Sequence, residues 1–270
     1  GDITSQANLS FNDPVTFTTT GTFNLGHNLV AATSTDASFT VTGPMLWNAG
    51  NITTSTGVVT LNGNLTLGGS GTRAITTTSG IVTIGDALTD TVTGAGVNLT
   101  INSGSATTTV NAALNNIATL TLGSTSQTGT MTVNNTLSAA SLVTGSTAYN
   151  IVLNSGDAGT STITNAVTFA NTTTLILGDQ LGDVFLFLGG LNATTQSMLN
   201  LAGTIRTAGN SVTVGNATSQ AYIIYDTLID TTNAGANPTG AVITFAGAVD
   251  NITSISAALA SDWTGGITSK

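Results

Sequence analysis

The chain has 270 residues, and its composition argues against helical and disordered proteins. It contains 57 Thr, 26 Asn and 32 Gly but only 3 Lys or Arg, and all 12 acidic residues are Asp. Thr favours strands, Gly and Asn favour turns, and the residues that usually cover helix surfaces are nearly absent. With 40% hydrophobic and 6% charged residues, the chain does not have the composition of a disordered protein. An all-β fold is expected.

The formal net charge of −9 excludes functions that need a basic surface. Nucleic acids and anionic membrane surfaces are bound by clustered Lys and Arg, and Arg73, Arg206 and Lys270 cannot form such a cluster. The absence of Cys excludes disulfides and thiolate metal sites. The longest apolar run, residues 184–188, is too short to span a membrane as a helix. We expect no nucleic-acid partner and no membrane insertion.

A short alternating stretch recurs along the chain, and we predict that each copy is a half-buried strand. An apolar residue alternates with Thr or Asn, and a small residue usually closes the stretch. Period-2 alternation places the apolar residues on one face and the polar residues on the other. In chain order the copies are residues 23–26, 39–43, 59–62, 82–85, 99–102, 120–123, 131–134, 151–154, 175–178, 212–215 and 243–245.

The spacing of these stretches predicts a β-solenoid. Equivalent residues of successive copies are mostly about 16 to 24 residues apart, with no helical pattern between them. The expected fold is therefore all-β, a parallel β-helix with irregular coils of about 20 residues, in which equivalent Asn or Thr side chains can form ladders. A Greek-key sandwich is the alternative, because regularly spaced turns also suit it.

We expect one elongated domain over residues 1–270. The segments 192–203 and 252–263 break the strand rhythm, and each is expected to be a short helix or a loop. Residues 252–270 are a candidate cap, because an uncovered solenoid end presents unpaired backbone groups. Since the chain starts at Gly1 without Met, we expect a processed product or an excised segment.

The chain resembles the exported β-solenoid adhesins of bacteria, namely autotransporter passengers and filamentous-haemagglutinin-like proteins. The resemblance rests on the style of residues 59–69, Val-Thr-Leu-Asn-Gly-Asn-Leu-Thr-Leu-Gly-Gly, and on a composition rich in Thr, Asn, Gly and Ala without Cys. It implies secretion, a right-handed parallel β-helix and a role in adhesion, aggregation or surface coating. It carries no functional residues to this chain.

The sequence contains few residues that could support catalysis. His27 is the only His, and we interpret it as a surface turn residue. The stretch Gly26-His27-Asn28 lacks the second Gly of the Gly-His-Gly element of β-helix pectinases, and no Arg-x-Lys follows. We therefore predict a protein that is not an enzyme.

The sharpest local motif is Asp-x-Leu-x-Asp, which occurs three times. Residues four apart in an extended chain project to the same face, and two carboxylates there repel each other unless solvent or a cation separates them. Ca²⁺ prefers oxygen ligands, so these acids are candidate Ca²⁺ ligands, and no other cofactor is expected. The alternative is that they form solvated acidic turns. The six residues are Asp86, Asp90, Asp179, Asp183, Asp226 and Asp230.

Thr triplets occur at 18–20, 76–78, 107–109 and 172–174, at unequal intervals along the chain. This spacing does not match one Thr per coil, so we interpret them as ordinary strand-surface Thr rather than as a flat ice-binding array.

The function we expect is that of a non-enzymatic structural protein of the cell exterior. Soluble β proteins protect strand edges with Lys, Pro and inward-pointing charges, and this chain has one Lys and 3 Pro. The sequence therefore predicts self-assembly into a surface filament or layer, with the chain itself as partner. The alternative is a stalk segment of a secreted adhesin that attaches to a host or neighbouring cell surface.

Overall fold

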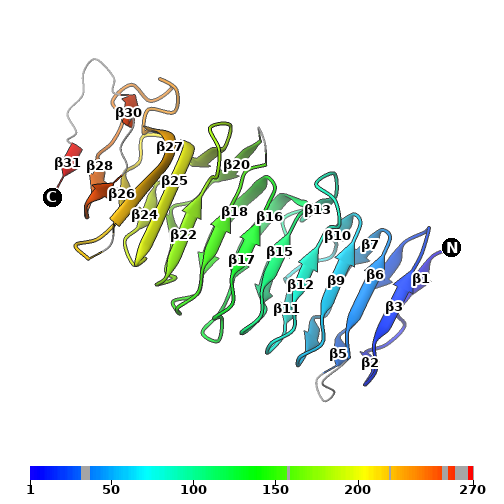
Figure 1. The fold of residues 1–270 in the computed structure, drawn as a ribbon. Coiled ribbons are helices and arrows are strands. Elements are labelled where there is room, and N and C mark those ends of the chain that lie inside the picture. The colour runs from blue at the N-terminus through cyan, green and yellow to red at the C-terminus, as the bar shows by residue number, and fades with distance from the viewer. Residues whose placement is uncertain (32–36, 157–158, 219, 251–254, 259–266, 270) are drawn as a thin grey trace.

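The computed structural model describes residues 1–31, 37–156, 159–218, 220–250, 255–258 and 267–269. These residues contain no helix, and their short strands stack as coils along one axis (Figure 1). Strands of successive coils pair in parallel, as in the pairing of Val82 with Val59. Since Greek-key sandwiches are antiparallel, the predicted β-solenoid is confirmed and the sandwich is wrong. The described part of the chain has no helix that could span a membrane.

One ladder of parallel strands, here called the first face, runs through the stack from end to end. The initial part of the long strand β25 belongs to it, as does the initial part of β27. Its strands are β3 (Val15–Thr18), β6 (Phe39–Thr42), β9 (Val59–Asn62), β12 (Val82–Ile84), β15 (Thr108–Val110), β17 (Met131–Val133), β19 (Ile151–Leu153), β22 (Thr174–Leu177), β25 (Met198–Arg206), β27 (Gln220–Asp230) and β29 (Val249–Asp250).

A second face is built in the same way from another strand of each coil. It also takes in the last residues of β25 and β27, and the first residues of β16 and β18. Its strands are β1 (Ile3–Thr4), β4 (Phe23–Leu25), β7 (Met45–Trp47), β10 (Leu65–Leu67), β13 (Thr91–Thr93), β16 (Ala113–Leu122), β18 (Leu137–Thr144), β20 (Thr160–Ile163), β23 (Val184–Phe187) and β30 (Ile255–Ala258).

The third face closes each coil and is formed by two sets of parallel strands. The N-terminal set ends with the last residues of β16 and β18, and the C-terminal set starts at β21, which contacts β18. The N-terminal strands are β2 (Leu9–Ser10), β5 (Leu29–Ala31), β8 (Ile52–Thr54), β11 (Thr72–Thr76) and β14 (Asn98–Asn102). The C-terminal strands are β21 (Val167–Thr168), β24 (Leu191–Ala193), β26 (Val212–Val214), β28 (Ile243–Phe245) and β31 (Ile267–Ser269).

The coils differ in length, and some are longer than the spacing of the alternating stretches predicts. On the first face, Phe39 pairs with Val59 of the next coil. Farther along the stack, Ala221 pairs with Val249, so the coil between these two residues is longer. The extra residues lie in corner turns, because the stack constrains the strands and leaves the turn length free.

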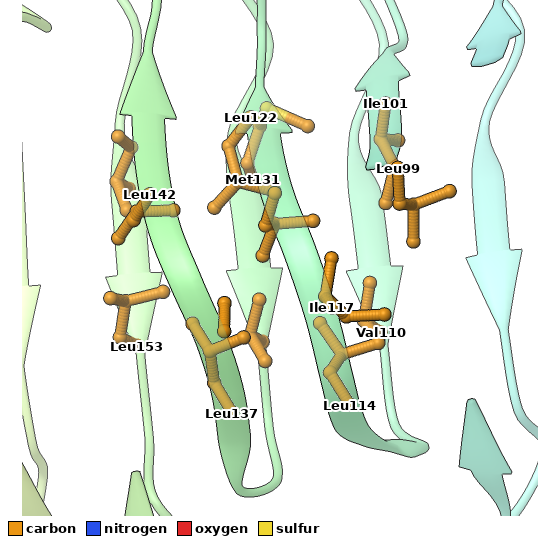
Figure 2. Close-up of a cluster of buried hydrophobic side chains, with 14 of the residues drawn as sticks. Leu99, Ile101, Val110, Leu114, Ile117, Leu122, Met131, Leu137, Leu142 and Leu153 are labelled. Carbon is orange, nitrogen blue, oxygen red and sulfur yellow. The ribbon is translucent and has the colours of Figure 1, made fainter. Parts of the chain in front are cut away.

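The core is the inner face of these strands, as the alternation predicts. Val82 and Ile84 are fully buried, and Thr83 between them points outward and is partly exposed. Figure 2 shows inward-pointing Leu, Ile, Val and Met side chains of successive coils in contact along the axis. Each such side chain stabilises the fold by about 1.5–3 kcal/mol when it is fully buried. Stacking of coils therefore supplies the apolar contacts that one coil cannot make alone.

Segments 192–203 and 252–263, which were expected to interrupt the series of strands, are described to different extents by the structure. Residues 192–203 are mostly strand, since they lie in β24 and β25, so a helix or loop there was a wrong prediction. Asn192 and Asn200 occupy outward positions of these strands. The apolar pattern did not reveal the strands, because it is less regular here than in the other copies. In the candidate cap, β30 and β31 pair in parallel with β27 and β28. Residues 251–254, 259–266 and 270 lie outside the described residues, and the cap itself stays a prediction.

The first coil differs from the coils that follow it. Within the described chain, β1, β2 and β3 each pair with one strand only, namely β4, β5 and β6. Phe11 and Phe17 are only partly buried, although Phe17 stacks on Phe23 with ring centroids 4.6 Å apart. Among the described residues, no coil therefore covers these strand edges and this part of the core.

Candidate functional site

Two of the three Asp-x-Leu-x-Asp motifs form turns of the same geometry. Each turn follows a first-face strand, β12 or β22, and starts at a glycine with φ of 80°, Gly85 or Gly178. Such positive φ values are easily adopted only by glycine. The chain therefore leaves the strand direction at these glycines and turns outward.

The second Asp of each motif holds its turn closed. Asp90 Oδ2 accepts the N–H groups of Asp86 and Ala87 at 3.0 and 3.2 Å. In the other turn, Asp183 Oδ2 accepts the N–H groups of Asp179 and Gln180 at 2.8 and 3.1 Å. The structure therefore brings together the two acids within each motif, and gives the second acid a structural role.

The carboxyl groups of Asp86 and Asp90 shift each other's pKa in opposite directions. A hydrogen bond with Asp90 is the main cause that raises the pKa of Asp86, with burial and charge repulsion from Asp90 adding to it. Burial alone would raise the pKa of Asp90, but hydrogen bonds from Asp86 and from backbone N–H groups outweigh it and lower that pKa. As the pH falls, Asp86 therefore takes up a proton before Asp90 does.

The tips of the two turns are apolar and exposed. Leu88 is 56% exposed and Leu181 is 61% exposed, the two highest values among the large hydrophobic side chains described. Asn135 fixes the first tip, because its Nδ2 donates to the carbonyls of Leu88 and Asn111 at 2.6 and 3.0 Å. The leucine is thus held outward.

A ladder of asparagine side chains runs between the two turns. Asn111, Asn134 and Asn154 directly follow β15, β17 and β19, the three first-face strands between the turns. Asn134 Nδ2 donates to Asn111 Oδ1 at 2.9 Å, and Asn154 Nδ2 donates to Asn134 Oδ1 at 3.3 Å. Asn111 Nδ2 donates to the carbonyl of Gly85 at 3.1 Å. The predicted side-chain ladder is confirmed here.

The ladder has a free oxygen at one end. Gly178 occupies the next equivalent corner, and it has no side chain that could donate to Asn154. Asn154 Oδ1 is buried and has no hydrogen-bond partner among the described residues. The glycine that starts the second turn therefore also ends the ladder.

The turns and the ladder together form an open groove of about 410 Å³. The amides lie between an acidic turn at each end, and no basic side chain contributes to the lining. The lining residues are Asp86, Leu88, Asn111, Asn134, Asn154, Gly156, Asp179 and Gln180. A smaller groove of about 170 Å³ lies on another corner, along residues 166–168 and 189–192.

The third motif is not a turn, so that prediction was wrong. Asp226 and Asp230 lie within the long strand β27. Asp230 Oδ2 accepts a hydrogen bond from Arg206 Nε at 2.7 Å, in an ion pair. Asp230 also accepts hydrogen bonds from Thr232 and from the N–H of Ala234. Its partners make it a buried structural acid.

The expected Ca²⁺ ligands are thus divided among separate places. No group of three or more His, Cys, Asp or Glu side chains gathers within the described residues. In each turn the second Asp already bonds to the backbone, and Asp230 is paired with Arg206. Ca²⁺ binding by these acids stays a prediction.

The remaining singled-out residues occupy structural or exposed positions. His27 is exposed in a bend after β4, as expected of a surface turn residue. Arg73 is 3% exposed, and its guanidinium donates to the backbone carbonyls of residues 47, 48, 68, 70 and 72. Burial lowers the pKa of Arg73. Neither His27 nor Arg73 lines the groove.

The structure contains a row of threonines that the spacing of the triplets concealed. One outward-pointing Thr from each of six successive first-face strands lies in register. The row consists of Thr16, Thr40, Thr60, Thr83, Thr109 and Thr132. The signal that could have found it is the middle residue of each alternating stretch, not the triplets.

Comparisons with family models, with curated proteins and with solved structures find no match.

Proposed function

We propose that this protein is a non-enzymatic structural protein of the bacterial cell exterior that self-assembles end to end into a filament or layer. The observation that carries the proposal is the open first coil. Its strands β1, β2 and β3 leave one edge without a partner within the described chain. A further parallel coil is the structure that would satisfy these edges.

The side chains of the first coil favour contact with another coil. Phe11 and Phe17 are partly exposed at this end, whereas Phe39 in the next coil is 0% exposed. No Lys or Arg protects the edge in residues 1–22, and the two acids there are Asp2 and Asp13. Because lysines and inward charges normally block edge pairing, their absence favours addition of a coil from a second copy.

The setting outside the bacterial cell is supported by the resemblance to exported β-solenoid adhesins. The repeated Thr, Asn and Gly pattern that carries the resemblance is also the pattern that builds the ladders and corners of this solenoid. The location at the bacterial cell exterior is inferred from that resemblance.

The variant Thr16→Lys tests the assembly. The N–H of Val15 donates to the carbonyl of Ser38 in the next coil at 2.9 Å, so alternation directs the backbone of Thr16 to the open edge. Thr16 is exposed. A lysine there should leave the fold intact and block end-to-end pairing. Light scattering at rising protein concentration and electron microscopy should show filaments for the unchanged chain and monomers for Thr16→Lys.

Thr83→Lys is the matched control, because Thr83 lies in the same row but in the middle of the stack. It should polymerise like the unchanged chain. If Thr83→Lys fails to assemble while Thr16→Lys still assembles, the copies contact each other side to side. If the unchanged chain stays monomeric at high concentration, the proposal is overturned.

A second candidate function is a stalk segment of a secreted adhesin. The groove between the two acidic turns favours it, because attachment needs a surface feature that can hold a ligand. In this case the unchanged chain should be an elongated monomer in light scattering, and the first coil would pair with another coil of the same polypeptide.

A further inference from the structure

We propose that the groove formed by the Asn111–Asn134–Asn154 ladder and the two acidic turns binds a neutral oligosaccharide. This inference deepens the second candidate function, attachment, and does not depend on self-assembly. The volume of about 410 Å³ falls in the range of small-molecule sites, about 300–1,000 Å³.

The lining offers donors and acceptors side by side. An Asn side-chain NH₂ has two hydrogens, and one hydrogen of Asn111, Asn134 and Asn154 is used in the ladder. The other has no partner that the structure records. The carboxylates of Asp86 and Asp179 lie at the two ends of the groove. Hydroxyl groups both donate and accept, so a polyol matches such a surface.

The same lining disfavours other ligand classes. Ca²⁺ and Mg²⁺ take oxygen ligands, whereas three amide NH₂ groups line this groove, and it contains no His or Cys ligand for a transition metal. An anion would meet Asp86 and Asp179 without a basic side chain, because Arg73 is held by backbone carbonyls and Arg206 by Asp230. An uncharged ligand with many hydroxyls remains as the best match.

The geometry also suits an extended sugar chain. The amides repeat once per coil along the axis, and adjacent strands lie about 4.8 Å apart, close to the length of one pyranose ring. The exposed side chain of Leu88 offers an apolar surface to the C–H face of a ring.

The test uses the full chain carrying Thr16→Lys, so that failure of assembly and failure of binding are separate results. A panel of neutral tetra- and hexasaccharides of glucose, galactose, mannose and N-acetylglucosamine is screened on an array, and hits are measured by calorimetric titration. Asn134→Ala removes the central amide and should weaken binding at least about tenfold, since several hydrogen bonds are lost. Leu88→Ser keeps the ladder and should weaken binding about threefold.

Asn28→Ala is the matched control. Asn28 belongs to another row of asparagines, where Asn28 and Asn8 accept backbone N–H groups of neighbouring coils, and it does not line the groove. It should bind like the parent, and thermal melting should show that all variants are folded.

Three results would overturn the proposal. The first is no saturable binding across the neutral panel, and the second is binding that Asn134→Ala and Leu88→Ser leave unchanged. The third is saturable binding of Ca²⁺ alone with Asp86 and Asp179 required, which would make the groove a cation site.

Discussion

At the scale of single residues, Tyr149 shows how one hydroxyl connects two coils. Its side chain is 1% exposed. The O–H donates to the carbonyl of Leu122 at 2.7 Å, and its oxygen accepts the N–H of Gly145 at 2.8 Å. Burial is the main cause that raises the pKa of Tyr149 to about 12, although the hydrogen bonds at Gly145 and Thr144 act in the opposite direction.

Alkaline pH should therefore lower the free energy of unfolding in part through Tyr149. An unfolded Tyr has a pKa of about 10, so between about pH 10 and 12 the unfolded state loses a proton that the folded state keeps. The stabilising contribution is complete below about pH 10 and is lost as the pH rises through about 12. Urea unfolding of the unchanged chain across this range should show the loss.

Tyr149→Phe should be about 1 kcal/mol less stable at neutral pH, because the carbonyl of Leu122 loses its hydroxyl partner. Its stability should fall less steeply between pH 10 and 12. Equal slopes for both proteins would show that other groups cause the alkaline loss.

Residue types predicted the core well and the acidic motifs only in part. Alternation identified Val82 and Ile84 as buried and Thr83 as outward, because a strand in a half-buried face has only two side-chain directions. The three Asp-x-Leu-x-Asp motifs are equal by that rule, yet two are turns and one is strand. The difference lies one residue earlier, where Gly85 and Gly178 permit positive φ, and Tyr225 stands before the third motif.

At the scale of elements, the corners between the third and first faces depend on close backbone approach. Thr77 Oγ1 donates to the carbonyl of Gly80 at 2.7 Å and accepts its N–H at 3.0 Å, closing one corner. The neighbouring corner repeats the first contact, with Thr54 Oγ1 and Gly57 at 2.7 Å. A β-carbon on Gly80 would lie 2.1 Å from the carbonyl oxygen of Gly57. The two coils can thus come this close only because residue 80 has no side chain.

Gly80→Ala should accordingly destabilise the fold by about 1–3 kcal/mol, the usual cost of added atoms at a packed site. Gly26→Ala is the control, because a β-carbon there meets nothing within 4 Å and the φ of Gly26 is not positive. It should be neutral or stabilising by up to about 1 kcal/mol. Urea unfolding measures both, and equal stability of the two variants would disprove the close approach.

The corners are also where prediction of the coil length failed. Apolar positions repeat because the strands must stay in register, but turns such as 86–90 and 179–183 lie outside the strand ladder, so strand register does not set their length. The number of residues per coil therefore varies, whereas the ladder of parallel strands is continuous. The groove along the asparagine ladder exists because turn length can vary, since two such turns form its ends.

At the scale of the whole molecule, stability should decrease toward the first coil. A coil inside the stack has two neighbours, whereas β1, β2 and β3 pair on one side only within the described chain. In repeat proteins, stability is approximately a sum of repeat and interface contributions, so the end coil lacks one interface.

Hydrogen exchange followed by mass spectrometry should show this gradient. Peptides of β3 should exchange faster than peptides of β12 or β17 in the monomer, because the end strands open more often. In assembled material, protection should rise at β3 and stay unchanged at β12. Uniform exchange across these strands in the monomer would contradict the expected gradient.

All paired strands on the three faces run parallel, and this has a consequence for any filament made by continuing them. A parallel ladder is extended by translation and rotation along its axis, and never by a twofold axis across it, which would reverse the strand direction. Head-to-tail contact of this kind does not close on itself and grows without limit. Such a filament would be polar. Its two tips would present different surfaces to incoming subunits, and growth at one tip could be controlled separately from growth at the other.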